Sequence, residues 1–206
     1  MLLAMSSKSP TEESLKARYV IDPVSLREVV RNKAAVESRI EELENIGEPG
    51  DAERIAWLRI LGRLQEAEEL GWITLVKSGG VTDTRQIVTP LPFQAVAGAL
   101  RLAHVMHWQK KYSQADQLFT VALESAQSEI DNSEMNPVVA RTLAAFAWQH
   151  LGKLHFDQGQ FADALRSFES ALVLRQELQS PEDQLSSTRQ AIRTAEACLA
   201  QKVRPS

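Results

Sequence analysis

The chain has 206 residues, of which 24% are charged and 6% are aromatic, and its formal net charge at pH 7 is −4. This mild acidic balance disfavours a nucleic-acid-binding surface, which requires clustered basic residues. The single cysteine, Cys198, excludes an intrachain disulfide and a zinc site built on several cysteines, and it favours a reducing compartment. No stretch has the length of a membrane span, and the apolar start at residues 1–5 is too short for a signal peptide. We therefore expect a cytoplasmic protein without nucleic-acid or membrane partners.

Helix signals recur along the whole chain, and no segment alternates for long with the period of two that marks strands, so the sequence predicts an all-α fold. Capping side chains stand directly before a proline at five places, which indicates helix starts: Ser9, Asp22, Thr89, Asn136 and Ser180. The helices expected from these starts and from the apolar periodicity are 24–46, 52–61, 64–77, 91–109, 113–130, 137–156, 161–178 and 181–201, together with an optional short helix at 10–17. Residues 1–21 are predicted to be a flexible segment, and residues 78–85 a flexible loop.

The first and last long helices are amphipathic. Residues 24–46 carry Val29, Val36 and Ile40 on one side, with Arg27 and Glu28 among the charged residues on the other. The helix expected at 181–201 has the same two-sided pattern. Such helices typically cap the two ends of a helical array. Pairing of either end with a second copy is the alternative, so both a monomer and a homodimer through the terminal helices remain open.

One helical hairpin is written twice, 49 residues apart. The residues Tyr112, Ala115, Phe119, Ala122 and Leu123 recur as Phe161, Ala164, Phe168, Ala171 and Leu172. A weaker third copy lies 48 residues earlier, at Leu64, Ala67 and Leu75. A single hairpin cannot bury its apolar face alone, so the repetition predicts stacked units that share one core. Gly159 suits the tight turn of the second copy, whereas Lys110 stands there in the first copy and predicts a different or strained turn.

The second copy carries a recognisable pattern. The run Trp148-x-x-Leu151-Gly152-x-x-His155, followed by Gly159-x-Phe161-x-x-Ala164-x-x-x-Phe168-x-x-Ala171, resembles the tetratricopeptide repeat (TPR) signature. The resemblance covers roughly residues 50–200. It departs from the family at His155, where tyrosine is usual, in lacking the late proline, and in its longer period, as in the extended repeats of kinesin light chains and bacterial regulators.

The resemblance implies a right-handed superhelical stack of antiparallel helix hairpins, a TPR-like α-solenoid. It would form a single domain over residues 22–206, with repeats at about 50–78, 91–131 and 137–179 and cap helices at 24–46 and 181–201. The first helix of each repeat would line a concave groove. The residues that map onto this groove, and that we expect to bind a partner, are Leu100, His104, His107, Trp108, Gln149, Lys153, Phe156 and Asp157.

Trp108 and Phe156 would anchor an extended or helical peptide, with Lys153 and Asp157 supplying charge at the rim. In the alternative interpretation both rings pack between helices and the groove is merely solvated. The sequence contains no phosphate-binding loop, no Gly-x-Ser-x-Gly elbow and no His-Glu-x-x-His motif. His104 and His107 have a spacing that can bind a metal, but packing roles are favoured, and no cofactor or metal is expected.

The function that we expect is a non-catalytic protein–protein interaction module that binds a peptide or helix of a partner protein. Two alternatives stay open. One is a regulator that senses a small molecule or a peptide, and the other is an enzyme with a site near His104 and His107.

Overall fold

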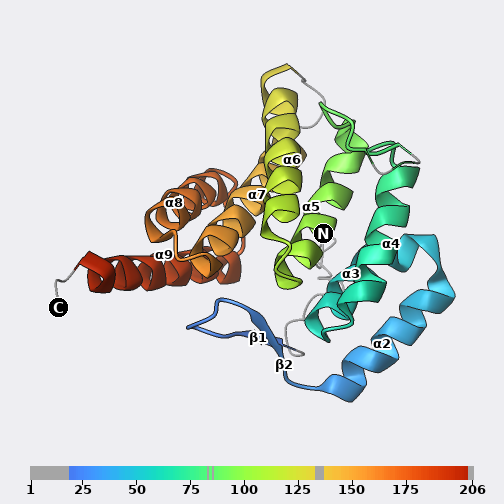
Figure 1. The fold of residues 1–206 in the computed structure, drawn as a ribbon, viewed down its shortest axis with the longest axis horizontal. Helices are drawn as coiled ribbons and strands as arrows, with labels where there is room; N and C mark the ends of the chain where they lie inside the picture. The colour runs from blue at the N-terminus through green and yellow to red at the C-terminus, as the bar shows by residue number, and fades with distance from the viewer. Residues whose placement is uncertain (1–18, 83, 85, 133–136, 204–206) are drawn as a thin grey trace, which may run out of the picture.

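The computed structural model describes residues 19–203 except 83, 85 and 133–136, and this part of the chain forms a curved array of α-helices (Figure 1). The helices are α2 (Lys33–Ile46), α3 (Asp51–Ile60), α4 (Leu64–Lys77), α5 (Phe93–Trp108), α6 (Tyr112–Asn132), α7 (Pro137–Asp157), α8 (Phe161–Glu177) and α9 (Glu182–Val203). Two short strands, β1 (Tyr19–Ile21) and β2 (Glu28–Val30), precede them, and a 3-10 turn, η1 (Glu48–Gly50), joins α2 to α3. Each helix packs on the next one along the chain. The predicted all-α, TPR-like solenoid is confirmed.

The stacking follows from side chains of matched size. Leu102 and Phe119 are fully buried in the largest core cluster, to which α4, α5, α6 and α7 all contribute. Gly152 of α7 lies so close to α8 that a Cβ atom there would be 2.5 Å from the ring of Phe168. Because real Cβ atoms do not approach a ring so closely, this crossing requires glycine. The small and large positions of the repeat therefore set the distance between neighbouring helices.

The turns that close the second and third helix pairs have the same geometry. Gly159 and Lys110 both adopt a left-handed backbone, with φ of 71° and 62°. In each turn the next amide donates to a carbonyl five residues back, from Gln160 to His155 and from Lys111 to Met106, both at 2.9 Å. The first copy thus makes the same turn with a non-glycine residue, at a conformational cost of about 1 kcal/mol or more.

The N-terminal part of the described chain departs from the expectation. The helix predicted for 24–46 begins only at Lys33, where Asn32 caps it by accepting a hydrogen bond from the Ala35 amide at 3.0 Å. Residues 19–30 form an antiparallel hairpin instead, in which Tyr19 faces Val30 and Ile21 faces Glu28. Residues 19–21, expected within a flexible segment, are strand β1. The optional helix at 10–17 lies outside the described residues.

The helix predicted for 24–46 begins too early because an aspartate before a proline occurs both at helix starts and in turns. Asp22 before Pro23 has the pattern of a helix cap, but its Oδ1 accepts hydrogen bonds from the amides of Val24 at 3.1 Å and Ser25 at 2.6 Å in a turn. Aspartate binds backbone amides in this way both at helix N-termini and in turns. The β-branched residues on either side of the turn favour strands, and the hairpin is the result.

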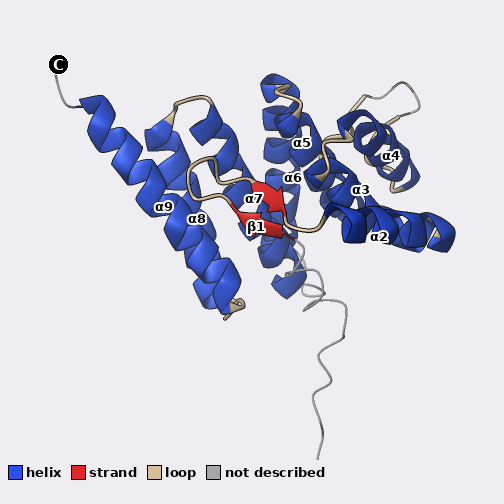
Figure 2. Cartoon of the chain, turned by 90° about the horizontal axis from the view of Figure 1, so that it is seen from below, coloured by secondary structure: helices blue, strands red, loops and turns tan. Residues whose placement is uncertain are grey.

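The array leaves one curved side open for the hairpin. The first helices of the three pairs, α3, α5 and α7, contact one another in series. The terminal helices α2 and α9 pack on α3 and α8, respectively. In Figure 2 the strands lie across the middle of this side, between α9 at one end and α2 and α3 at the other.

Candidate functional site

The N-terminal hairpin (residues 19–30) occupies the concave side that the resemblance predicted to bind a peptide (Figures 1 and 2). The contacts of three consecutive residues, Leu26, Arg27 and Glu28, reach helices from α3 to α9. Tyr19 adds a contact with Trp57 of α3, with ring centres 6.1 Å apart. The groove therefore holds an extended segment of the same chain.

Leu26 anchors the hairpin at one end of the groove. Its side chain is only 1% exposed and packs with Ala164 and Phe168 of α8 and with Ala191 and Ala195 of α9. Its backbone is left-handed, with φ of 56°. Burying a leucine side chain stabilises by about 1.5–3 kcal/mol, which offsets the cost of that conformation.

Arg27 makes the next contact, on α7. Its Nη2 lies 2.5 Å from Asp157 Oδ2, and the same oxygen lies 3.0 Å from His107 Nε2. The guanidinium also stands 5.4 Å from the centre of the Trp108 ring. Burial tends to raise the pKa of the Asp157 carboxyl, but hydrogen bonds from His107 and Arg27 hold it below its usual value. Two predicted groove residues, Trp108 and Asp157, thus bind the hairpin.

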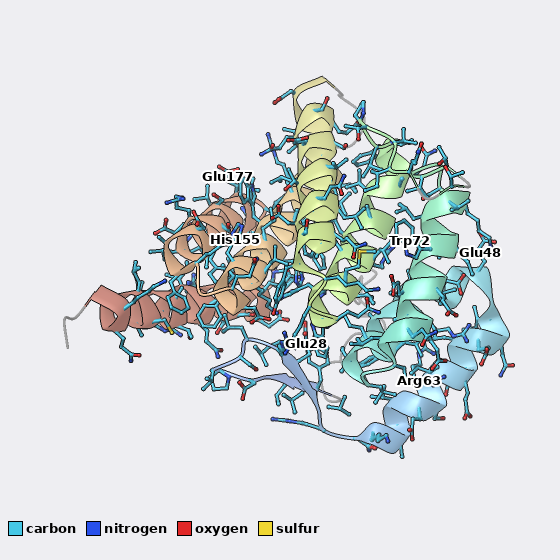
Figure 3. The ribbon with its side chains drawn as sticks, in the orientation of Figure 1. Glu28, Glu48, Arg63, Trp72, His155 and Glu177 are labelled. Atoms are coloured by element: carbon cyan, nitrogen blue, oxygen red, sulfur yellow. The ribbon has the colours of Figure 1, made fainter. Side chains whose placement is uncertain are left out.

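Glu28, labelled in Figure 3 at the hairpin, completes the set by pairing with two cations. Its carboxylate lies 3.1 Å from Arg59 Nη1 on α3 and 3.7 Å from Lys153 Nζ on α7, and all three side chains are at most 11% exposed. Burial tends to raise the pKa of Glu28, but the charges of Lys153 and Arg59 hold it far below its usual value. Arg59 also lies over Trp108, 4.6 Å from the ring centre. Separating paired charges that are buried away from water costs much free energy.

Three histidines lie under the hairpin: His104 and His107, which the resemblance maps onto the groove, and His150, which it does not. The rings of His104 and His150 contact each other with centres 3.8 Å apart, and both are at most 5% exposed. Burial lowers the pKa of both imidazoles well below 6.5, and it also lowers that of His107, although Asp157 opposes the shift. All three are therefore neutral at pH 7. Among the described residues, no three His, Cys, Asp or Glu side chains are arranged to hold a metal ion.

The other predicted groove residues serve the fold. Leu100 is 1% exposed and belongs to the main core. Gln149 accepts hydrogen bonds from Thr188 at 2.9 Å and Arg175 at 3.2 Å, which ties α7 to α8 and α9. Phe156 packs beside Phe161 with ring centres 5.3 Å apart. Each of these three side chains thus contacts a neighbouring helix, and Gln149 also lines a pocket of the groove.

The hairpin divides the remaining space of the groove in two. One pocket of about 330 Å³ lies between the hairpin and α3, α5 and α7, and a second of about 290 Å³ lies between the hairpin, α7, α8 and α9. Tyr19, Glu28 and His150 line both pockets. The hairpin is thus a shared wall, and each half of the groove has the size of a small-molecule site.

One serine lies near a histidine and an aspartate, but not in a catalytic arrangement. Ser167 Oγ is 3.5 Å from His155 Nδ1, and His155 Nε2 is 3.8 Å from Asp116. Both distances exceed those of the hydrogen bonds that activate a nucleophile. The Ser167 hydroxyl donates instead to the Asp163 carbonyl at 2.9 Å, and its residue is 3% exposed. This group serves the packing of α7 and α8.

Comparison with known proteins supports the family indicated by the repeat. The family model of the tetratricopeptide repeat matches residues 145–178. Those residues cover most of α7 and all of α8. The matched segment contains the crossing of Gly152 and Phe168 and the turn at Gly159. No curated protein and no solved structure matches the chain. A tetratricopeptide repeat indicates a protein–protein interaction module. No helix in the described residues is both long and apolar enough to span a membrane.

Sequence reasoning found the groove but missed what fills it. The pattern around Arg27 and Glu28 predicts the solvated face of a helix, because the sequence does not show which residues a charged side chain contacts in the folded protein. No local pattern in the sequence marks Arg59, although it is only 5% exposed. A signal was present only in the β-branched residues that flank Asp22-Pro23.

Proposed function

We propose that this protein is a non-catalytic interaction module whose concave groove binds an extended segment of a partner protein, and that the N-terminal hairpin occupies the groove until the partner displaces it. The kind of contact made by the hairpin carries this proposal. One apolar side chain inserts between helices, and two charged neighbours pair with groove residues, which is how peptide grooves fix both affinity and register.

The groove chemistry describes the partner. The groove offers Asp157 to a cation, Arg59 and Lys153 to an anion, and the space between α8 and α9 to an aliphatic side chain. A competing segment should therefore carry an aliphatic, a basic and an acidic residue in sequence. The 21-residue helices α6 and α7 are why we assign the chain to the extended-helix type of TPR, and its single cysteine fits a cytoplasmic location.

The test supplies the hairpin in trans. A fluorescein-labelled peptide of residues 17–32 is titrated with the whole chain, and anisotropy gives its dissociation constant. Leu26→Asp in the protein places a charge in the apolar space between α8 and α9, so the protein's own hairpin should leave the groove. We expect this variant to bind the peptide at least about tenfold more tightly than the unmodified protein, because release of the anchor corresponds to 1.4 kcal/mol or more.

The matched control is Val24→Asp, which adds the same charge at a hairpin residue that is 75% exposed. It should bind the peptide no better than the unmodified protein. Trp108→Ala in the Leu26→Asp background should weaken peptide binding by about thirtyfold while circular dichroism shows unchanged helicity. Equal and weak binding by all variants would refute a peptide-binding groove.

A further inference from the structure

One side chain in the groove has a charge without a partner. Arg101 of α5 lines the pocket between the hairpin and α3, α5 and α7 and is mostly withdrawn from solvent. Burial lowers its pKa, and no neighbouring carboxylate opposes that shift. Within the described part of the chain, its guanidinium makes no hydrogen bond and no ion pair. Burying a charge is costly unless it is paired, so this arrangement suits an anion that arrives from outside.

The two carboxylates of the same pocket are already engaged. Glu53 receives two hydrogen bonds from Arg39, both at 2.9 Å, and one from Trp57 Nε1 at 3.0 Å. Glu28 pairs with Arg59 and Lys153. With these groups neutralised by protein partners, Arg101 is the pocket cation that remains for a ligand.

The rest of the wall is apolar and largely aromatic. Trp57, Ile55 and Phe146 line the pocket together with Tyr19 and the ring of His104. The cavity of about 330 Å³ lies at the lower end of the range for small-molecule sites. Flat rings of this kind pack well against a flat apolar body.

We propose that this pocket binds a small carboxylic acid with an aromatic or similarly flat apolar body, and that Arg101 pairs with its carboxylate. A guanidinium presents two parallel N–H groups that match the two oxygens of a carboxylate. A dianionic group such as a phosphate ester would call for a second unpaired cation, and the pocket wall has none in the described residues. This pocket shares Tyr19 and Glu28 with the hairpin as part of its wall, but its proposed ligand-binding group, Arg101, takes no part in the contacts of Leu26, Arg27 and Glu28 on which the peptide-binding proposal rests.

Isothermal titration calorimetry on the whole chain with 2-naphthoate tests the proposal. Naphthalene-2-carboxamide has the same shape without the charge, and inorganic phosphate has charge without the apolar body. We expect one 2-naphthoate per chain with a dissociation constant below about 1 mM, binding of the carboxamide at least about tenfold weaker, and no heat from phosphate.

Three variants locate the site. Arg101→Met should weaken the binding of 2-naphthoate at least about tenfold and leave the binding of the carboxamide unchanged. Arg101→Lys should retain part of the affinity, because lysine keeps the positive charge but lacks the two parallel N–H donors of the guanidinium. Ala56→Phe fills the pocket and should abolish binding of both aromatic probes. Arg141→Met, which removes an exposed arginine of α7, is the matched control and should change nothing.

Circular dichroism and melting temperature verify that each variant is folded. Equal affinity for the acid and its amide, or undiminished affinity in Arg101→Met, would overturn the assignment of Arg101. Absence of 2-naphthoate binding to the unmodified protein would overturn the site, and Arg101-dependent binding of phosphate alone would overturn the ligand class. Each of these results leaves the outcome of the hairpin peptide titration unaffected, so the two proposals can fail separately.

Discussion

Two helical glycines illustrate how single residues control this array. A Cβ atom on Gly152 would lie 2.5 Å from the ring of Phe168, whereas one on Gly98 would find its nearest neighbour, Leu75 Cδ1, at an ordinary 3.7 Å. Both residues lie inside helices with ordinary helical backbones. The two glycines therefore differ in their surroundings. Gly152 is required by close packing, whereas at Gly98 only the helix propensity of the residue matters.

We expect Gly152→Ala to destabilise the fold by about 1–3 kcal/mol, because the ring or the helix must move. Gly98→Ala should be neutral or stabilise by up to about 1 kcal/mol, because alanine favours the helix and fits the space. Urea denaturation followed by circular dichroism measures both variants. Similar effects of the two substitutions would contradict the close crossing at Gly152.

The buried imidazoles predict a pH dependence of stability. The pKa values of His104 and His150 are lowered in the folded state by burial, so the unfolded chain binds more protons once the pH falls below about 6.5. Stability from these groups is complete above that pH and declines below it, by up to about 1.4 kcal/mol per pH unit for each histidine. The carboxyl of Glu28, whose pKa is also lowered, contributes only below about 4.5, outside this window.

Urea denaturation at pH 7.5, 6.5 and 5.5 tests this. The unfolding free energy should be nearly constant between the first two values and fall clearly at the third. A variant with His104→Asn and His150→Asn starts from lower stability but should have a flatter profile, since asparagine does not titrate. An unmodified protein that is equally stable at all three pH values would show that these rings are not shielded from solvent.

At the scale of elements, the N-terminal hairpin is attached to the helices mainly by side chains. Its two strands pair with each other, whereas its contacts with the helices come from Leu26, Arg27 and Glu28 and from the Thr194 hydroxyl of α9, which donates to the Pro23 carbonyl at 3.3 Å. Loss of the Glu28 charge should weaken this attachment strongly, because Arg59 and Lys153 would then be buried without the carboxylate that they share. Breaking a buried pair in this way is far more costly than breaking a surface pair.

We expect Glu28→Gln to cost about 3 kcal/mol of hairpin docking. Hydrogen exchange should show loss of protection at Tyr19–Ile21 and Glu28–Val30 while α5 to α7 stay protected. Glu37→Gln is the control, because Glu37 pairs with Lys33 on the exposed side of α2 at 3.6 Å, and its loss should cost less than about 0.5 kcal/mol. Unchanged exchange in the Glu28→Gln hairpin would mean that its other contacts, including those of Leu26 and Arg27, hold it without the Glu28 charge.

At the scale of the whole molecule, the terminal helices close the array without leaving one large apolar surface. In the described part of the chain, the exposed large apolar side chains are dispersed over the hairpin, α2, α4, the connection from α4 to α5, α7 and α8, and they are Val24, Val29, Ile46, Ile73, Val88, Val138, Val139 and Val173. Stable dimers normally bury a continuous patch of about 800 Å² on each partner. Dispersed valines and isoleucines do not provide one.

We therefore expect a monomer. Size-exclusion chromatography with light scattering should give a mass near 22.9 kDa at micromolar concentration. A mass of twice that value would favour the homodimer through the terminal helices. Ile46→Glu on α2 would then test whether that end forms the contact.

The sequence by itself determined the helical repeat. Small residues such as Gly152 and Ala164, large ones such as Phe168, and the turn at Gly159 recur with a period that only stacked hairpins satisfy, and helix formation depends on residues close together in the chain. It also indicated which helices face the groove, because that follows from the order of helices within each repeat.

Only the tertiary structure decided what fills the groove. Arg27 and Asp157 are 130 positions apart, and nothing local to either residue signals the pair. Asp22-Pro23 fits a helix cap and a turn equally well, so local rules leave the choice to packing. In the folded chain Leu26 lies between α8 and α9 instead of extending α2. Whether two distant charged residues pair depends on the spatial distance between them after folding, and a local sequence pattern does not give that distance.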